Sequence, residues 1–295
     1  MFSEFYKFIF FLLLLSSISV ILSKSRMESK EFLFADSGLQ ETKLTPSENL
    51  ITKIFQFQKS IFLLDFGKTD TGEKVIDHIS NRLIPTIHLS IFSILLGSLS
   101  GIGLSLFLII RDNKLLFEIF TQTAKIILST PIFVVSVLLL LIFFYYLEIL
   151  PPGGYEKGNI LYLVMPGIAL GSRVFARQLL LTYDEAKTEM NSYYIIFLKA
   201  RGFTINRIVF KHVLIKIFPV ILIFILMDFG SILSGAIIVE EIFFFPGIGK
   251  SMYIAIKSLD ENLLQALFVY TGIVFYLFGR IARNLQSILS GKGLE

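Results

Sequence analysis

Residues 217–239 read IFPVILIFILMDFGSILSGAIIV, an apolar run that contains a single charged residue, Asp228. An α-helix rises about 1.5 Å per residue, so about 20 apolar residues cross the hydrocarbon core of a bilayer, which is about 30 Å thick. Helices of soluble domains instead alternate an apolar and a polar face. The run therefore predicts a transmembrane helix.

Five further apolar runs predict membrane helices, which gives six in all and an all-α, polytopic fold. The first, Phe8–Leu22, follows Lys7 and resembles a signal peptide, but no small-residue cleavage site follows it, so we expect an uncleaved anchor. Pro85 is expected in the first turn of the second helix, where its missing N–H costs nothing. An amphipathic helix beginning near Leu115 is expected to lead into the third. The remaining predicted helices are Pro85–Ile110, Ile126–Leu147 (ending at Pro151-Pro152-Gly153-Gly154), Ile160–Leu181 and Leu263–Ile281.

The composition of the whole chain agrees with this fold class. Of 295 residues, 54% are hydrophobic and 17% are charged, whereas soluble domains have about 25% charged residues. With no cysteine, the chain has no disulfide, thiolate metal site or cysteine nucleophile, and its three histidines make a metal cage improbable. We therefore expect no metal site. The net charge of +4 is explained by basic membrane loops, so no nucleic-acid partner is expected.

The distribution of basic residues predicts the orientation in the membrane. Lysine and arginine accumulate on cytoplasmic loops, so the basic loops and both termini are expected in the cytoplasm of a bacterium, and the protein in its inner membrane. The predicted domains are an N-terminal anchor at 1–23, a periplasmic insert at 24–80, a transmembrane domain at 81–285 and a cytoplasmic tail at 286–295. A stretch at 50–64 is expected to lie on the membrane surface. The residues counted as cytoplasmic are Arg111, Lys114, Lys125, Arg173, Arg177, Lys187, Lys199, Arg201, Arg207, Lys211, Lys216, Arg280, Arg283 and Lys292.

The loop at residues 183–216 is long and carries a helical apolar stripe that must be buried on something. Gly202 is expected to end a short helix in a left-handed cap, and Thr204 to start the next one. The alternative is a solvated loop that is basic only because lysine and arginine accumulate on cytoplasmic loops during membrane insertion. The stripe consists of Leu179, Tyr183, Ala186, Met190 and Phe197.

Seven groups of residues between positions 65 and 275 share an order and spacing with a known family. They are Asp65-Phe66-Gly67; Arg82-Leu83, Pro85-Thr86 and Leu89; Pro131 and Phe133; Pro151-Pro152-Gly153-Gly154; Tyr194 to Pro219; Gly235-Ala236, Glu240, Phe243 and Pro246-Gly247-Ile248-Gly249; and Ala255-Ile256, Asp260 and Gln265. In these positions the chain resembles binding-protein-dependent ABC importer permeases, most closely the dipeptide, oligopeptide and nickel branch. The family's Ala-Pro-Gly-Asp-Pro stretch has no match between Ser23 and Ser47, and its Asp-Pro-Arg tail has none in residues 290–295. Where the family's loop commonly has Arg-Thr-Ala-Arg-Ala, this chain has the bulkier and less basic Ile196-Phe197-Leu198-Lys199-Ala200. These departures leave the substrate and the cognate partners open.

The resemblance implies a permease subunit that is not itself an enzyme and binds no cofactor. ATP and Mg²⁺ are expected on two cytoplasmic ATPase subunits, whose closure drives alternating access. The other expected partners are membrane lipid, a periplasmic binding protein and a second permease subunit, either a related chain or a second copy. A short peptide is the favoured solute, with nickel or another solute left open. The resemblance places the ATPase contact at Lys199, Ala200, Arg201, Gly202, Phe203, Arg207 and His212.

Two further groups of residues are candidates for function. Asp228 is expected either to line the translocation path and meet a cation, or to be protonated or hydrogen-bonded against a second permease subunit. The turn near the outer mouth is expected to be a gate or docking ledge, or else a plain interfacial turn. Gly97, Gly101 and Gly103 are expected to let two helices approach closely. The residues of the predicted outer gate are Glu240, Phe243, Pro246, Gly247 and Gly249.

Two other classes of membrane protein remain as rivals. A secondary transporter or channel would need no ATPase, but would be expected to show intramembrane charge pairs or inverted repeats. An intramembrane hydrolase would need a Ser–His or Asp–Asp constellation, and His88 has only serine neighbours. Gly249-Lys250-Ser251 imitates a phosphate-binding loop, but Phe244 occupies the position of the required first glycine.

Overall fold

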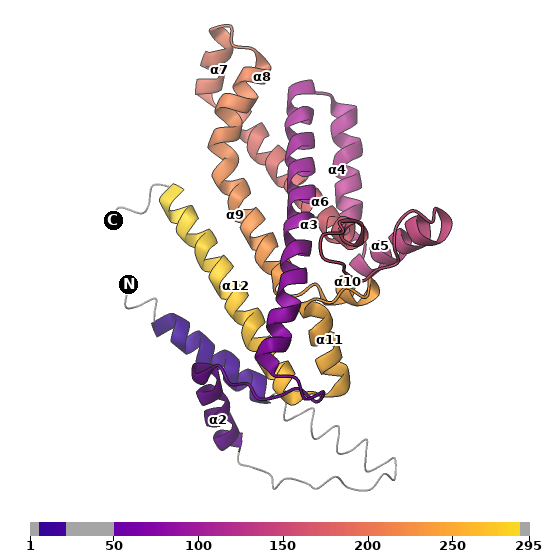
Figure 1. Ribbon diagram of the computed structural model, residues 1–295. Coiled ribbons are helices and arrows are strands. Elements are labelled where there is room, and N and C mark those ends of the chain that lie inside the picture. The colour runs from indigo at the N-terminus through magenta and orange to yellow at the C-terminus, as the bar shows by residue number, and fades with distance from the viewer. Residues whose placement is uncertain (1–5, 22–49, 290–295) are drawn as a thin grey trace.

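The computed structural model describes residues 6–21 and 50–289 of the protein (Figure 1). Within these residues the chain is helical apart from loops and one isolated β-bridge between Lys68 and Lys74. The predictions for residues 24–49 and for the last residues of the tail lie outside the described ranges. After the helix Tyr6–Ile21, the elements are α2 (Leu50–Leu63), α3 (Val75–Arg111), α4 (Lys114–Ser129), α5 (Ile132–Leu139), η1 (Leu140–Tyr146), α6 (Leu161–Met190), α7 (Tyr193–Ala200), α8 (Ile205–Ile208), η2 (Val209–Val213), α9 (Leu214–Leu233), α10 (Ile237–Ile242), α11 (Ile248–Ser258) and α12 (Glu261–Leu289).

The second predicted span begins earlier than expected. Its helix α3 starts at Val75, so Pro85 lies inside the helix and not in its first turn. The prediction was wrong because the helix continues through the polar residues that precede the apolar run. At its other end, α3 stops at Asp112, which has a left-handed φ of 45°. The Asn113 side chain then accepts hydrogen bonds from the Leu115 and Leu116 N–H groups (2.9 and 3.2 Å) and caps α4.

The amphipathic helix expected from near Leu115 is present as α4, but the third predicted span, Ile126–Leu147, is broken at Pro131 and continues as α5 and η1. The segments Lys114–Ser129 and Ile132–Tyr146 meet at a bend of 101°, with Pro131 at the break. Proline has no N–H to continue the helical ladder, and this ends α4 before the apolar run does. The Arg173 Nη2 donates to the exposed carbonyls of Leu128 (3.0 Å) and Thr130 (3.2 Å), which stabilises the break.

The helices on either side of the predicted loop also differ from expectation. α6 does not end at Leu181 but continues to Met190. The helix that contains α9 runs from Ile205 to Leu233, six residues short of the predicted end at Val239. Gly235 interrupts it, with a left-handed φ of +121° and no room for a side chain, because a Cβ there would lie 3.0 Å from the Cα of Gly249.

α3 and α6 pack closely over two glycines of the predicted small-residue face. A Cβ on Gly97 would clash with the carbonyl oxygen of Gly171, and one on Gly101 would lie 2.6 Å from the carbonyl oxygen of Phe175. Both predictions are confirmed. Gly103 is different, since it is exposed and nothing lies within 4 Å of its Cβ position. It points away from the contact and plays no part in it.

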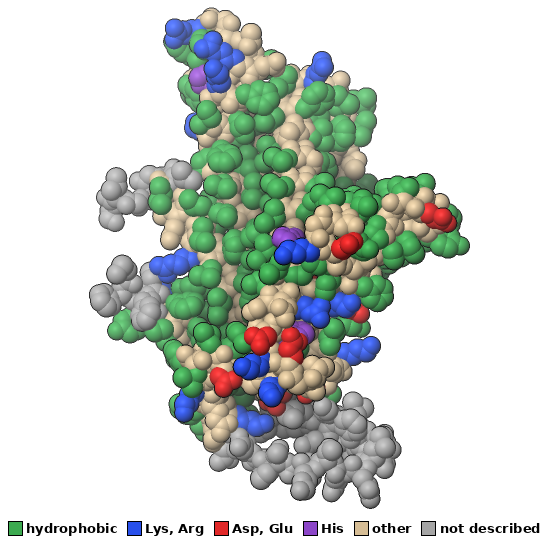
Figure 2. Space-filling model, viewed as in Figure 1, with side chains coloured by type: hydrophobic (Ala, Val, Ile, Leu, Met, Phe, Trp, Pro, Cys, Tyr) green, Lys and Arg blue, Asp and Glu red, His purple; other side chains and the backbone are tan. Residues whose placement is uncertain are grey.

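The described residues contain three helices that are long and apolar enough to cross a membrane, or four if the bent pair α4–η1 forms one span. The three are α3, the helix from Ile205 to Leu233, and α12. The all-α, polytopic class is confirmed, whereas the number six stays a prediction. Figure 2 shows hydrophobic side chains over most of the visible face, basic side chains at the end that carries α7 and α8, and a mixed group of charged side chains toward the opposite end.

Candidate functional site

The predicted loop forms a helical tip, α7–α8, at one end of the molecule (Figure 1). The Gly202 N–H donates to the Lys199 carbonyl (2.9 Å) and the Phe203 N–H to the Leu198 carbonyl (3.2 Å). Gly202 has a left-handed φ of +80°, so the turn is a Schellman cap. Thr204 follows as the N-cap residue of α8. The predicted sequence of helix, glycine and helix is confirmed.

The tip is fixed to the rest of the chain by a shared apolar core. Ile195 and Ile208 are fully buried, and Leu198 and Phe203 pack partly buried against the same cluster, which also contains residues of α3. The predicted apolar stripe belongs to such cores as well: Leu179, Ala186 and Met190 are buried inside the chain. These residues therefore offer no surface to a partner. Phe197, the last residue of the stripe, is instead 59% exposed on α7.

A polar clamp holds the start of α7. The Lys216 Nζ donates to Glu189 Oε1 at 2.7 Å and lies 4.8 Å from the centre of the Tyr194 ring. Glu189 also accepts a hydrogen bond from Ser192, which precedes α7. The clamp connects the end of α6, the start of α7 and the start of α9. The position of the tip is therefore coupled to two long helices.

The outer surface of the tip combines exposed apolar and basic side chains. Tyr193 is 92% exposed, Ile196 54% and Phe197 59%. The guanidinium of Arg201 lies 5.6 Å from the Phe197 ring centre, and that of Arg207 lies 4.5 Å from the ring centre of Phe203. Figure 2 shows the basic side chains gathered over this end of the visible face. Of the predicted contact residues, those exposed are Lys199, Ala200, Arg201, Gly202 and Arg207, and those half-buried are Phe203 and His212.

Asp228 forms an ion pair within the chain. Its side chain is 3% exposed, and Oδ1 accepts from the Arg177 guanidinium on α6. Arg173, one helical turn earlier, caps the break at Pro131 as described above. Counting these two arginines as loop residues was therefore wrong, because both lie within α6 against neighbouring helices. Two arginines four residues apart inside a predicted span were the sequence signal for this cluster.

The residues of the predicted outer gate meet in a buried hydrogen-bond node. Glu240 on α10 is completely buried; its Oε2 accepts from the Lys250 N–H (2.9 Å) and its Oε1 from the Thr86 hydroxyl (3.2 Å). The Thr86 oxygen also accepts from the Ile248 N–H at 2.9 Å. Side chains from α3 and α10 thus cap the start of α11. Burial raises the pKa of Glu240, which lies outside the spanning helices, to about 7.

The other gate residues pack around this node. Phe243 is fully buried, and a Cβ on Gly247 would clash with the Glu240 carboxylate. Gly249 lies against the backbone of Ala236 and Ile237. A Cβ on Gly249 would lie 2.6 Å from the backbone nitrogen of Ile237. The exposed aromatic residue of the turn is Phe244, 66% exposed with a left-handed φ of 50°. The sequence missed Thr86 as a partner, because 154 residues separate it from Glu240.

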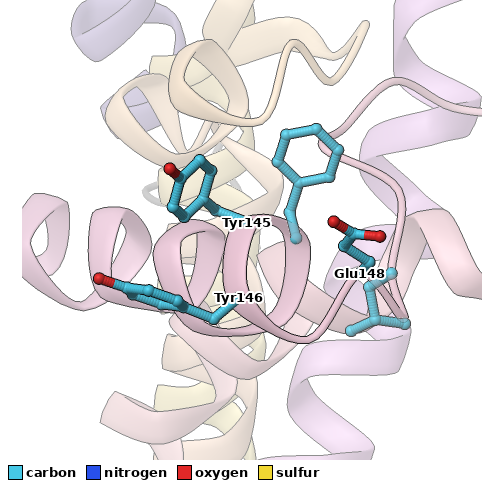
Figure 3. Close-up of a pocket in the computed structure, with 5 residues that line it drawn as sticks. Tyr145, Tyr146 and Glu148 are labelled. Atoms are coloured by element: carbon cyan, nitrogen blue, oxygen red, sulfur yellow. The ribbon is translucent and has the colours of Figure 1, made fainter.

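The arm formed by α5 and η1 borders a cavity of about 660 Å³. Tyr145 and Tyr146 are about 70% exposed, and Figure 3 shows their hydroxyls pointing away from Glu148 on the other side of the cavity. The carboxylate and the two phenols therefore do not converge on one point. The tyrosines suit the polar boundary of a bilayer, as expected for an aromatic belt.

The three long apolar helices define a helical integral membrane protein. The family described as binding-protein-dependent transport system inner membrane component matches residues 71–292, and the chain belongs to this family of ABC-type transport permeases. It is 27% identical to the dipeptide transport system permease protein DppB of Lactococcus lactis, covering 85% of this chain and 86% of that relative. It is 25% identical to the oligopeptide transport system permease protein OppB of Salmonella typhimurium, covering 85% and 83%. The glutathione transport system permease protein GsiC of Escherichia coli is 24% identical, covering 77% and 74%. The sequence-based assignment to this family is confirmed.

Proposed function

We propose that this chain is one transmembrane subunit of an importer that moves short peptides delivered by a periplasmic binding protein. Membership of the permease family supports transport, and the names of the relatives support a peptide substrate. The chain pairs with a second permease subunit, and two separate ATPases bind the ATP and Mg²⁺. Among the described residues, no group of three His, Asp or Glu side chains is placed to hold a metal ion.

The observation that carries this proposal is the exposed apolar face on a rigid tip. Ile195 faces inward and is fully buried, while its neighbour Ile196 is 54% exposed. An exposed apolar face with a basic rim is typical of a protein contact. The clamp between Glu189 and Lys216 connects the tip to α6 and α9, so movement of an ATPase bound to the tip is transmitted to the membrane helices.

The proposed orientation puts this tip in the cytoplasm and residues 65–74 in the periplasm. Even without Arg173 and Arg177, the tip and its flanks hold six basic residues, whereas the outer loops hold few. Figure 1 shows α12 running from the opposite end of the molecule toward the end that carries the tip, which supports a cytoplasmic C-terminus. The proposal puts the N-terminus on the same side of the membrane. The basic residues are Lys187, Lys199, Arg201, Arg207, Lys211 and Lys216.

Two substitutions at Gly202 test the proposal. Nothing lies within 4 Å of its Cβ position, and both asparagine and aspartate tolerate left-handed φ better than other residues. Gly202→Asn is expected to retain most uptake, whereas Gly202→Asp adds a negative charge at the contact. We expect Gly202→Asp to insert normally but to lose coupling between ATPase stimulation and peptide uptake. Normal coupled transport by Gly202→Asp would refute the proposed contact.

The rival function is that of a secondary transporter. Measurement of peptide uptake distinguishes it from an importer. An importer loses uptake when the ATPase subunits are deleted or when ATP is depleted with the proton gradient intact. A secondary transporter keeps uptake under ATP depletion and loses it when the gradient is dissipated.

A further inference from the structure

The ion pair between α6 and α9 is unequally exposed. The Arg177 side chain is 47% exposed, whereas the Asp228 side chain is 3% exposed. The second carboxylate oxygen of Asp228, Oδ2, is buried without a hydrogen-bond partner among the described residues. The group that this pair presents to its surroundings is therefore the cation. This reverses the expectation, drawn from Asp228 alone, of a site for a cationic group.

The local charge balance is also positive. Arg173 and Arg177 lie one helical turn apart on α6, and their ion pairs within the described residues involve one carboxylate, that of Asp228. Arg173 donates to backbone carbonyls, which carry no net charge. Two guanidinium groups and one carboxylate leave a net charge of about +1. In a low-dielectric environment, such a charge attracts an anion more strongly than it does in water.

Arg177 lies on a face of α6 that leads toward the tip. Positions 177, 181, 184 and 188 share this face; Leu181 is half-buried, whereas Arg177, Asp184 and Thr188 are exposed. An arginine facing acyl chains at the centre of a helix costs about 3 kcal/mol or more, so charged residues there face a water-filled cavity or a partner. This face of α6 therefore borders a hydrated space that opens toward the tip.

The guanidinium can bind a further group while it holds Asp228. Arginine has five N–H donors, and the pair with Asp228 involves one of its terminal nitrogens. The remaining donors match the geometry of a carboxylate, which guanidinium binds through two parallel hydrogen bonds. Arg177 combines exposure with unused donors, and the neighbouring Arg173 supplies a positive charge that no ion pair among the described residues balances. A peptide with a free C-terminus carries the complementary group.

We propose that Arg177 lines the translocation path and binds the C-terminal carboxylate of the transported peptide, with Asp228 as its positioning residue. This inference rests on the proposed function, because it assumes that the hydrated space is the path of an importer for peptides. Asp228 holds the guanidinium on the face of α6 and does not itself contact the peptide.

The test compares two probes in cells that express the complete importer: radiolabelled trialanine, and trialanine amide, which lacks the carboxylate. The first variant, Arg177→Gln with Asp228→Asn, removes both charges together and leaves no unpaired ion. The second, Arg177→Glu with Asp228→Arg, keeps an ion pair but exposes the carboxylate. Membrane levels are measured by immunoblot, and co-purification of the second permease subunit measures assembly.

The quantity that decides is the ratio of trialanine to trialanine amide uptake below saturation. We expect the neutral pair to lower this ratio at least five-fold and the exchanged pair to lower it further. A purely structural role of the ion pair would reduce uptake of both probes equally and leave the ratio unchanged. That result would overturn the inference and leave the proposed function intact. Loss of the second permease subunit from the purified complex, with an unchanged uptake ratio, would do the same.

The failure of the proposed function has a different result. In that case wild-type cells take up neither probe above the level of cells that lack the chain. This result would overturn the peptide substrate and the inference together. If both variants fail to accumulate, the ratio for Arg177→Lys at normal membrane level decides. The lysine ammonium is a point charge and does not form the two parallel hydrogen bonds that a guanidinium forms with a carboxylate. We therefore expect the ratio of trialanine to trialanine amide uptake to fall two- to five-fold, and an unreduced ratio would overturn the inference.

Discussion

The outer node and the α7–α8 tip both consist of residues that match the family, but they use those residues in opposite ways. In the node, Glu240 is completely buried and its carboxylate oxygens accept hydrogen bonds from Thr86 and the start of α11. At the tip, Arg201, Gly202 and Arg207 are exposed. The same kind of sequence match therefore marks internal architecture in one region and an available surface in the other.

Residues of a family motif in a membrane protein can therefore have either of two roles. A motif residue with all its partners inside the chain is expected to matter for stability, whereas an exposed one is expected to matter for a partner. Substitutions in the two regions should accordingly separate folding from transport.

Adjacent isoleucines in α7 provide the largest expected contrast. Ile196→Ala together with Phe197→Ala removes exposed apolar contacts, and we expect uptake to fall at least ten-fold with thermal stability nearly unchanged. Ile195→Ala removes a fully buried side chain, so we expect a loss of about 2–4 kcal/mol in stability. Uptake in cells and thermal unfolding of the purified protein measure the two effects. Equal destabilisation by both variants would remove the distinction between the two faces of α7.

Removal of the node carboxylate is the next largest effect. Glu240→Ala leaves the N–H of Lys250 without its acceptor, whereas the Thr86 hydroxyl keeps the Arg82 carbonyl (3.2 Å) as an acceptor, and we expect about 2–3 kcal/mol of lost stability. Glu148→Ala is the control, since Glu148 is exposed. Thermal unfolding in detergent measures both. A Glu240→Ala protein as stable as the control would show that the node does not support the fold.

The contact between α3 and α6 predicts a smaller contrast between two glycines. Gly101→Ala puts a methyl group 2.6 Å from a backbone oxygen of α6, so we expect a loss of about 1–3 kcal/mol. Gly103→Ala meets nothing within 4 Å and replaces glycine inside a helix, so we expect a change near zero or a gain of up to about 1 kcal/mol. Unfolding midpoints of the two variants check the difference. A destabilised Gly103→Ala protein would place that face against a neighbour.

The smallest expected effect is a dependence of the free energy of unfolding on pH. Burial raises the pKa of Glu240 from 4.5 to about 7, so the folded state holds its proton more tightly than the unfolded state. The resulting stability is fully present below pH 4.5 and is lost as pH rises through 7. Between pH 6 and pH 8 we expect wild-type stability to fall by about 1 kcal/mol more than that of Glu240→Gln. Parallel pH profiles of the two proteins would contradict the raised pKa.

Local chemistry made part of this structure predictable from the sequence. A glycine with a threonine two residues later was enough to predict the turn at Gly202 and the helix start at Thr204, since both depend on backbone preferences of single residues. The close contact at Gly97 and Gly101 also follows from small residues at helical spacing. The apolar runs located the long helices, although their ends shifted where polar residues continue a helix.

The sequence-based predictions that failed concern residues whose partners are distant in the sequence. Pro131 was noted as a family match, but an apolar run on both sides concealed the break that it causes. Asp228 was recognised as unusual, yet its partner Arg177 had been counted with the basic loop. No spacing rule connects Thr86 with Glu240, because the packing of α3 against α10 and α11 brings them together.

The absence of cysteine from the chain allows site-specific crosslinking at the tip. A single cysteine is introduced at Ile196, and a thiol-reactive photocrosslinker is attached to it in membranes that contain the whole importer. We expect a crosslink from Ile196→Cys to an ATP-binding subunit, identified by mass spectrometry, and none from Phe244→Cys at the other end of the molecule. Equal crosslinking of that subunit from both positions, or from Phe244→Cys alone, would contradict the assignment of the tip as the ATPase contact.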